Sequence, residues 1–199
     1  MSLSKQQPKT NAMHTPFHYT IGMSYIELIT TTCILIILML FAYPYIQDWR
    51  KKYEAQELFR QISPILSHAR SSALIYHRAI SVCGGSSSEC TGLWRHGILA
   101  FTDFNHNGKL DQETDRILSY TPLELQFGSL TWRGAGARAH IIYQENGLPL
   151  GSNGAFIYCG ENQKYHRAII LSMMGNARRS PDRNQDGIYE DANGRPLVC

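Results

Sequence analysis

Several signatures of enzymes and metal proteins are missing from this 199-residue sequence. No two cysteines have the short spacing of a zinc site, and the eight histidines are scattered. No segment has the pattern of a nucleophile elbow, a phosphate loop or a zinc-binding helix. The formal net charge of +3 is too small to indicate nucleic-acid binding by itself. We therefore predict that the protein is not an enzyme and that it has no cofactor, apart from the Ca²⁺ candidate considered below.

Acidic residues are absent from residues 1–22, and residues 23–43 carry one charge, that of Glu27. At a rise of about 1.5 Å per residue, an apolar helix over residues 23–43 is long enough to cross a bilayer core. The run continues past Pro44 into a helical pattern without the small-residue cleavage site of a secretory signal. We therefore expect a retained membrane anchor, although basic residues on both sides leave its orientation open.

Glu27 is the informative residue of the apolar run. A charged side chain in the middle of a membrane helix costs about 2.5–3.5 kcal/mol on insertion scales, and less near an end. One interpretation is that Glu27 reaches the interface, since it lies near the start of the run. The other is that a positive charge pairs with it, and cleavage between Gly22 and Met23 would create such a charge as a new α-amino group.

Residues 21–29, with the sequence IGMSYIELI, resemble the processing motif of type IV pilins and type II secretion pseudopilins. The resemblance implies that a prepilin peptidase cuts after Gly22 and methylates Met23, where the family usually has phenylalanine. It also implies that Glu27 pairs with the N-terminus of a neighbouring subunit during assembly. Pro44 falls where many pilins have a proline that kinks the helix.

Beyond the apolar run, residues 45–76 have apolar side chains at helical spacing, which predicts an amphipathic helix whose stripe packs in a core. Pro64 interrupts the pattern and predicts a bend, with Ser63 displaced from the helical conformation. The stripe consists of Ile46, Trp49, Tyr53, Leu58, Phe59, Ile62, Leu66, Ala69 and Ala73.

After residue 76 the helical pattern gives way to short apolar segments bounded by turn residues. They predict strands at residues 79–83, 97–102, 116–120, 129–132, 139–143, 154–158 and 168–172. The sequence therefore predicts an α+β fold, in which a long N-terminal helix packs on a mainly antiparallel β head. We divide the chain into a cleaved leader (1–22), a helix (23–76, transmembrane over 23–43) and a globular head (77–199).

The head resembles one pilin branch, the minor pilins of the FimT/FimU type and the pseudopilins of the GspH type. The segments that carry the resemblance are 69–73 (ARSSA), 94–103 (WRHGILAFTD) and 174–178 (MGNAR). It implies a single-pass inner-membrane protein with a periplasmic head, which assembles with other pilin subunits through their N-terminal helices. We predict a minor pilin at or near the tip of a type IV pilus; the alternative is a type II secretion pseudopilin of the GspH type.

A basic group near the C-terminus raises the question of DNA. FimT-type pilins are thought to bind DNA through a Gly-Arg-x-Arg motif, whereas residues 175–179 here read GNARR and lack the first arginine. Exposed arginines can contact phosphates, but nearby acids also make an ordinary solvated surface plausible. The candidate DNA-binding residues are Lys164, Arg167, Arg178, Arg179 and Arg183.

Two loops have oxygen-bearing side chains at alternate positions followed by glycine, as calcium loops do. The alternative is a hairpin turn, which uses the same residue types. For the first loop, built on Asp103, Asn105, Asn107, Gly108 and Asp111, we expect a turn. For the second we also favour a turn over Ca²⁺, with Asp182, Asn184, Asp186 and Glu190 as the candidate ligands.

Five cysteines are present, and Cys33 lies alone in the apolar run. The remaining four form an even set, which suits an oxidising compartment such as a periplasm. Sequence alone leaves three pairings open. We prefer Cys83–Cys90, which closes a short loop, and Cys159–Cys199, which ties the C-terminus to a late strand.

Overall fold

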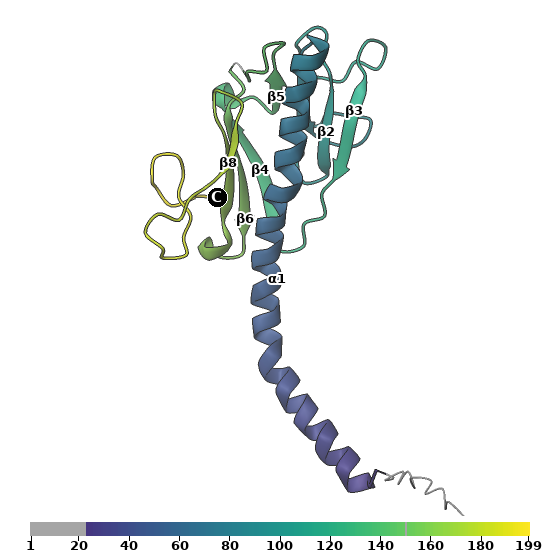
Figure 1. Ribbon diagram of the computed structural model, residues 1–199, viewed down its shortest axis with the longest axis vertical. Helices are drawn as coiled ribbons and strands as arrows, with labels where there is room; N and C mark the ends of the chain where they lie inside the picture. The colour runs from purple at the N-terminus through teal and green to yellow at the C-terminus, as the bar shows by residue number, and fades with distance from the viewer. Residues whose placement is uncertain (1–22, 150) are drawn as a thin grey trace, which may run out of the picture. The chain divides into compact units, whose positions relative to one another are not determined.

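The computed structural model describes residues 23–149 and 151–199. The chain divides into two compact units, Met1–Pro44 and Tyr45–Cys199. One helix, α1 (Tyr25–Tyr76), continues through both, and the strands of the head follow it along the chain (Figure 1). The expected leader, residues 1–22, lies outside the described residues.

The head contains two antiparallel four-stranded sheets in the part of the chain that the structure describes. The first has the order β3-β2-β1-β5 and the second the order β4-β6-β7-β8. The first sheet consists of β1 (Ile80–Gly84), β2 (Gly97–Thr102), β3 (Ile117–Pro122) and β5 (His140–Tyr143). The second consists of β4 (Gly128–Gly134), β6 (Gly154–Gly160), β7 (Arg167–Leu171) and β8 (Ala177–Arg179). Short 3-10 helices, Ala135–Ala137 and Gln163–Tyr165, lie between strands.

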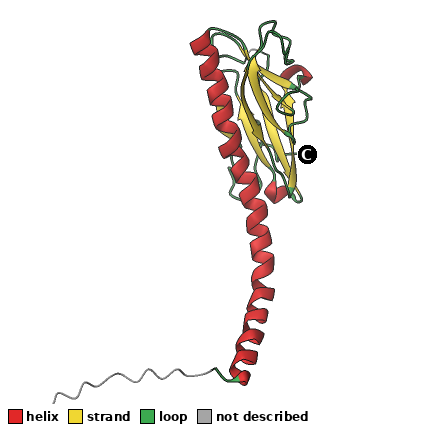
Figure 2. Ribbon diagram, turned by 90° about the vertical axis from the view of Figure 1, so that its right-hand side faces the viewer, coloured by secondary structure: helices red, strands yellow, loops and turns green. Residues whose placement is uncertain are grey.

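The main core lies where the head part of α1 packs on the strands, as Figure 2 shows from the side. Leu58, Ile62 and Leu66 of α1 are buried there with side chains from both sheets, including Val82 and Phe156. Side chains alternate between the two faces of a strand, so Val82 of β1 and Phe156 of β6 lie on the inner faces of their sheets. The predicted α+β fold, a long helix packed on antiparallel strands, is therefore confirmed.

The predicted displacement of Ser63 from the helical conformation, just before Pro64, is wrong. Ser63 and Pro64 both belong to α1, which is assigned as a helix throughout. A proline in a helix costs about 3 kcal/mol, because it removes one hydrogen bond and crowds the preceding turn. On both sides of it, Ile62, Ile65 and Leu66 are buried in the core. Burying each such side chain contributes about 1.5–3 kcal/mol, which offsets the cost.

All seven predicted strands overlap strands of the structure, and the prediction for residues 97–102 has the observed bounds. The strand β8 was not predicted. It has three residues and two of them are arginine, so its sequence lacks the apolar alternation by which a strand is recognised. It forms because it pairs with β7, with Ile169 opposite Arg179 and Leu171 opposite Ala177.

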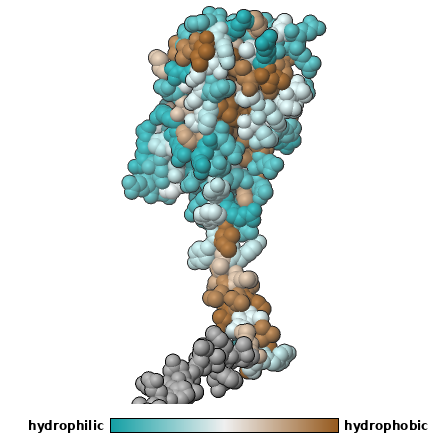
Figure 3. All heavy atoms as spheres, turned by 45° about the vertical axis from the view of Figure 1, so that its right-hand side comes forward, coloured by the Kyte–Doolittle hydropathy of each residue, from teal (hydrophilic) through white to brown (hydrophobic). Residues whose placement is uncertain are grey.

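The first unit consists, where it is described, of the beginning of α1. Its large apolar side chains are exposed, and they give this segment a hydrophobic surface (Figure 3). Among the described helices, α1 is the one that is long and apolar enough to cross a membrane. Cys33 is a free, exposed cysteine on this segment.

Candidate functional site

The expected processing site lies at the start of α1. Gly22 is outside the described residues, Met23 is exposed, and Glu27 is in the first helical turn. A carboxylate at this position interacts favourably with the positive end of the helix dipole. The Glu27 side chain has no hydrogen bond or ion pair with any residue the structure describes, so its carboxylate is available to a partner.

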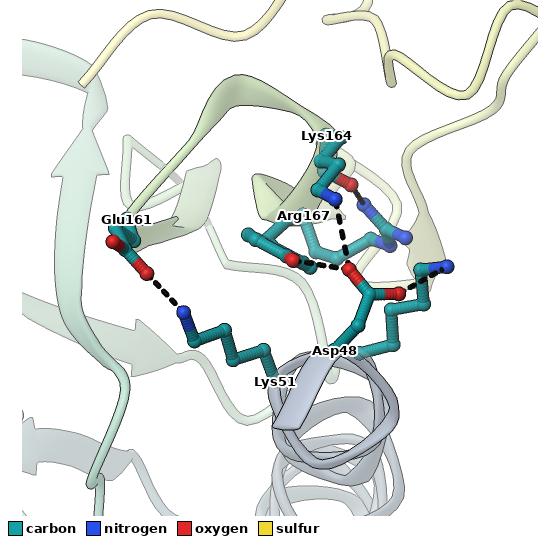
Figure 4. A network of polar contacts seen from close by, with 7 residues as sticks. Asp48, Lys51, Glu161, Lys164 and Arg167 are labelled. Atoms are coloured by element: carbon teal, nitrogen blue, oxygen red, sulfur yellow. Dashed lines mark hydrogen bonds and ion pairs between the residues drawn. The ribbon is translucent and has the colours of Figure 1, made fainter. Parts of the chain in front are cut away.

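Where α1 enters the head, a group of charged side chains joins the helix to the loop before β7 (Figure 4). Asp48 accepts hydrogen bonds from Lys164 Nζ at 2.8 Å and from the Tyr165 hydroxyl, and it pairs with Lys52 Nζ at 2.7 Å. Hydrogen bonds from Lys164, then Lys52 and Tyr165, hold the pKa of Asp48 well below its usual range. Asp48 is therefore ionised at neutral pH and ties α1 to this loop.

Lys51 adds a second link between the same two elements, through an ion pair with Glu161. Hydrogen bonding to Glu161 raises the pKa of Lys51 and lowers that of Glu161. Both groups are solvent-accessible, so salt will weaken this pair. The link positions the helix more than it stabilises the fold.

Glu54 joins α1 to the start of the second sheet. Its carboxylate accepts the backbone N–H of Gln126 at 2.7 Å, the N–H of Phe127 at 3.0 Å and the hydroxyl of Tyr158 at 2.8 Å. Burial and, secondarily, the hydrogen bond to Glu54 raise the pKa of Tyr158. Bonds to a charged acceptor are the stronger kind, so Glu54 fixes the entry of β4 against the helix.

These contacts correct the expectation that the apolar stripe packs in the core along its whole length. Ile46, Trp49 and Tyr53 are 53%, 63% and 48% exposed, and burial of the stripe begins only near Leu58. Trp49 and Tyr53 stack on each other with ring centroids 5.4 Å apart. Polar side chains on other faces of α1, and not the stripe, hold residues 48–54 to the head.

The structure does not gather the five candidate DNA-binding residues on one free surface. Lys164 is bonded to Asp48, Arg167 lies over the Tyr189 ring at 3.7 Å, and Arg179 lies over the Phe59 ring at 4.3 Å. Arg178 points to the opposite face of the sheet from Arg179, because side chains alternate along β8. Arg183 is exposed in the loop that follows.

Both candidate calcium loops use their oxygens to close turns. In the first, buried Asp103 accepts hydrogen bonds from Ser81 Oγ and from the backbone N–H groups of Asn107 and Gly108. In the second, Asp182 accepts from the N–H of Gly187, and Glu190 accepts from that of Arg183. Asn184 and Asp186 bond to each other and to nearby backbone. Residues 23–149 and 151–199 contain no group of three His, Cys, Asp or Glu placed to hold a metal.

The described residues contain two disulfides, Cys83–Cys90 and Cys159–Cys199, which is the pairing preferred from the sequence. Cys83 and Cys90 join β1 to the loop that follows it, on the outer face of the first sheet. Cys159 of β6 holds the C-terminal residue of the chain. Leu197 is buried beside this bond against Ile157 and Ala168, so the C-terminal segment covers the outer face of the second sheet.

The protein family described as type II transport protein GspH matches residues 59–175. The chain belongs to the GspH family. This membership confirms the expected kinship with minor pilins and pseudopilins. The GspH match begins near Leu58, where α1 becomes buried, and ends after β7. Met23 and Glu27 lie before the match, and Arg178, Arg179 and Arg183 lie after it.

The solved structures that are similar include a minor pilin and a minor pseudopilin. The type IV minor pilin FimU of Pseudomonas aeruginosa is 20% identical, with a TM-score of 0.48 over 69% of this chain and 93% of that chain. The minor pseudopilin EpsH of the type 2 secretion system of Vibrio cholerae is 11% identical, with a TM-score of 0.46 over 63% and 95%. A comparison with curated proteins found no match.

The residues that join this GspH-family head to its helix were not predicted from the sequence. Asp48 and Glu54 read as ordinary solvent-facing charges, because they lie off the apolar stripe. Their partners in the head are 72–117 residues away in the sequence. The one available signal is that several charges gather on α1 just after its apolar run, where the chain leaves the predicted membrane segment.

Proposed function

We propose that the chain is a minor pilin of a type IV pilus, a structural subunit without enzymatic activity. It joins the filament through the first part of α1 and carries its head at or near the tip. The supporting observation is the exposed apolar surface of α1 with Glu27 in its first turn. Such a surface needs a bilayer before assembly and neighbouring helices after it.

In this proposal a prepilin peptidase removes residues 1–22 and methylates Met23. The chain waits in the inner membrane with its head in the periplasm, where the two disulfides can form. On assembly, Glu27 pairs with the α-amino group of a neighbouring subunit. An ion pair in an apolar filament core removes an unpaired carboxylate from that environment.

The second candidate is a pseudopilin of the type II secretion system. It is favoured by the description of the matching family as a type II transport protein. The chain's gene can be deleted to separate the two. Loss of surface pili with secretion intact supports the pilus, and the converse result supports the secretion system.

A contribution to DNA uptake has weaker support. Lys164, Arg167 and Arg179 already have intramolecular partners, and Arg178 and Arg179 face opposite sides of their strand. Gel shifts of the intact protein with the Arg178→Ala/Arg179→Ala variant test this contribution. A shift that depends on both arginines supports it.

The assembly role is tested with Glu27→Ala. The variant should be processed and reach the membrane, but it should be depleted from sheared filaments, because it lacks the partner for the neighbouring N-terminus. The control is Glu57→Ala, which removes a carboxylate from the part of the same helix that packs on the head. Incorporation of Glu27→Ala at the native level would show that the carboxylate has no role in assembly.

A further inference from the structure

A small pocket lies between α1 and the second sheet, and nothing in the proposed function uses it. Its cavity volume is about 70 Å³. The walls come from the helix segment 55–59 and from β6, β7 and β8. They are mainly apolar and include Leu58, Phe59, Phe156 and Ile169.

Two arginines line this pocket, and the fold holds each against an aromatic ring. The Arg167 guanidinium lies 3.7 Å from the centre of the Tyr189 ring, and that of Arg179 lies 4.3 Å from the centre of the Phe59 ring. One terminal nitrogen of Arg167 also donates to the carbonyl of Lys164 at 2.8 Å. Little side-chain entropy remains to be lost when a ligand binds to groups held in this way.

The Nε–H of Arg167 is buried and has no hydrogen-bond partner among the described residues. A buried donor without an acceptor destabilises the folded state, and more so if it is charged. Burial also lowers the pKa of Arg167. An anionic acceptor in the pocket would offset both effects.

Of the described residues that line the pocket, none is acidic. Glu54 lies behind Tyr158, and its oxygens accept hydrogen bonds from that hydroxyl and from two backbone N–H groups. Asp182 is the acid whose charge acts on Arg167, but within the described chain it forms no ion pair with it. The pocket therefore presents two positive charges to whatever enters.

We propose that this pocket binds a carboxylate, which an Asp or Glu side chain of a neighbouring subunit presents. The identity of that partner as a subunit rests on the proposed assembly function. Guanidinium groups bind carboxylates with two parallel hydrogen bonds, and the apolar walls suit the methylene stem of the incoming side chain. The small volume accommodates such a group.

A nucleic acid fits these observations less well than an acidic side chain. The loop beside the pocket carries Asp182, Asp186, Glu190 and Asp191 together with Arg183 and Arg195, so it offers a polyanion no continuous positive surface. A single carboxylate needs no such surface, because inside the pocket it contacts only the residues that line it.

The test is a titration of the full chain in detergent micelles, followed by NMR of the Arg167 Nε–H signal. The probe is N-acetyl-glutamate amide, and the matched control is N-acetyl-glutamine amide, which has the same shape without the charge. We expect the glutamate probe to shift the signal at concentrations at least tenfold lower. Equal effects of the two probes, or no shift with either, would overturn the proposal.

Substitutions locate the site. Arg179→Gln should weaken binding of the glutamate probe at least tenfold. Arg178→Gln, one residue away on the opposite face of β8, should leave that binding unchanged. Equal losses in both variants would place the effect outside the pocket. A single-stranded oligonucleotide that shifts the same signal at a lower concentration than the glutamate probe would assign the pocket to nucleic acid instead.

The titration needs no filament, so its outcome is independent of assembly. If Glu27→Ala enters filaments normally, the proposed function fails, while the carboxylate site can still be present. If the titration fails and Glu27→Ala is excluded from filaments, the pocket proposal alone is lost.

Discussion

Replacement of Cys159 and Cys199 by serine should release the C-terminal segment before the sheets unfold. The bond links residues 40 positions apart and fixes the last residue of the chain to β6. The segment that follows β8 has few buried apolar side chains, and Leu197 is the main one. The disulfide is therefore expected to contribute much of what holds this segment down.

The free energy that the disulfide contributes follows from the length of the loop that it closes. The chain-entropy relation gives about 4 kcal/mol for a loop of about 40 residues at 25 °C. Burial of Leu197 contributes about 1.5–3 kcal/mol, and its N–H donates to the Tyr189 carbonyl at 3.0 Å. These local contacts are weaker than the lost constraint, so the double serine variant should open locally while the rest of the head stays folded.

Limited proteolysis with trypsin measures this opening. Arg183 lies in the segment and is exposed, so cleavage after it should become much faster in the Cys159→Ser/Cys199→Ser variant. The control is Cys83→Ser/Cys90→Ser, which removes the other disulfide and should leave cleavage at Arg183 near the native rate. Unchanged cleavage in the first variant, or equal acceleration in both, would refute the reasoning.

Three further predictions concern the head. Leu66→Ala should lower the free energy of unfolding by about 2–5 kcal/mol in chemical denaturation, because the side chain is 1% exposed in the main core. Asp48→Asn should speed hydrogen exchange around Lys164 without unfolding the sheets, and unchanged exchange there would argue against the helix contact. Burial and the nearby Arg138 lower the pKa of His140, so stability should be full above about pH 6.5 and fall as the pH drops through the folded pKa. His140→Asn should remove that part of the pH dependence in thermal melts.

The order of the helix and the strands could be predicted from the sequence, because the pattern that indicates each element lies within a short segment of the chain. The apolar run over residues 23–43 and the turn residues around Gly97–Thr102 need no knowledge of distant partners. β8 escaped prediction because its pairing with β7, and not its own composition, makes it a strand. The uninterrupted helix at Pro64 was not predicted from the sequence, because burial of the neighbouring side chains outweighs the local cost of a proline in a helix.

The candidate site was predicted less well, for a related reason. Arg167 and Arg179 were recognised as basic residues, but their aromatic partners come from other elements, Tyr189 near the C-terminus and Phe59 on α1. Residue types and spacing cannot show that two arginines from different strands line one pocket. The same holds for Asp48, whose role depends on a loop far away in the sequence.

The most direct test of the central claim is the mass of the mature protein. The chain is extracted from membranes of cells that make a prepilin peptidase, and its N-terminal peptide is analysed by mass spectrometry. We expect residues 1–22 to be absent and Met23 to carry a methyl group on its α-amino nitrogen, which leaves a cationic N-terminus to pair with Glu27 of a neighbouring subunit. A chain that retains its leader in such cells would contradict the account of this protein as a processed pilin.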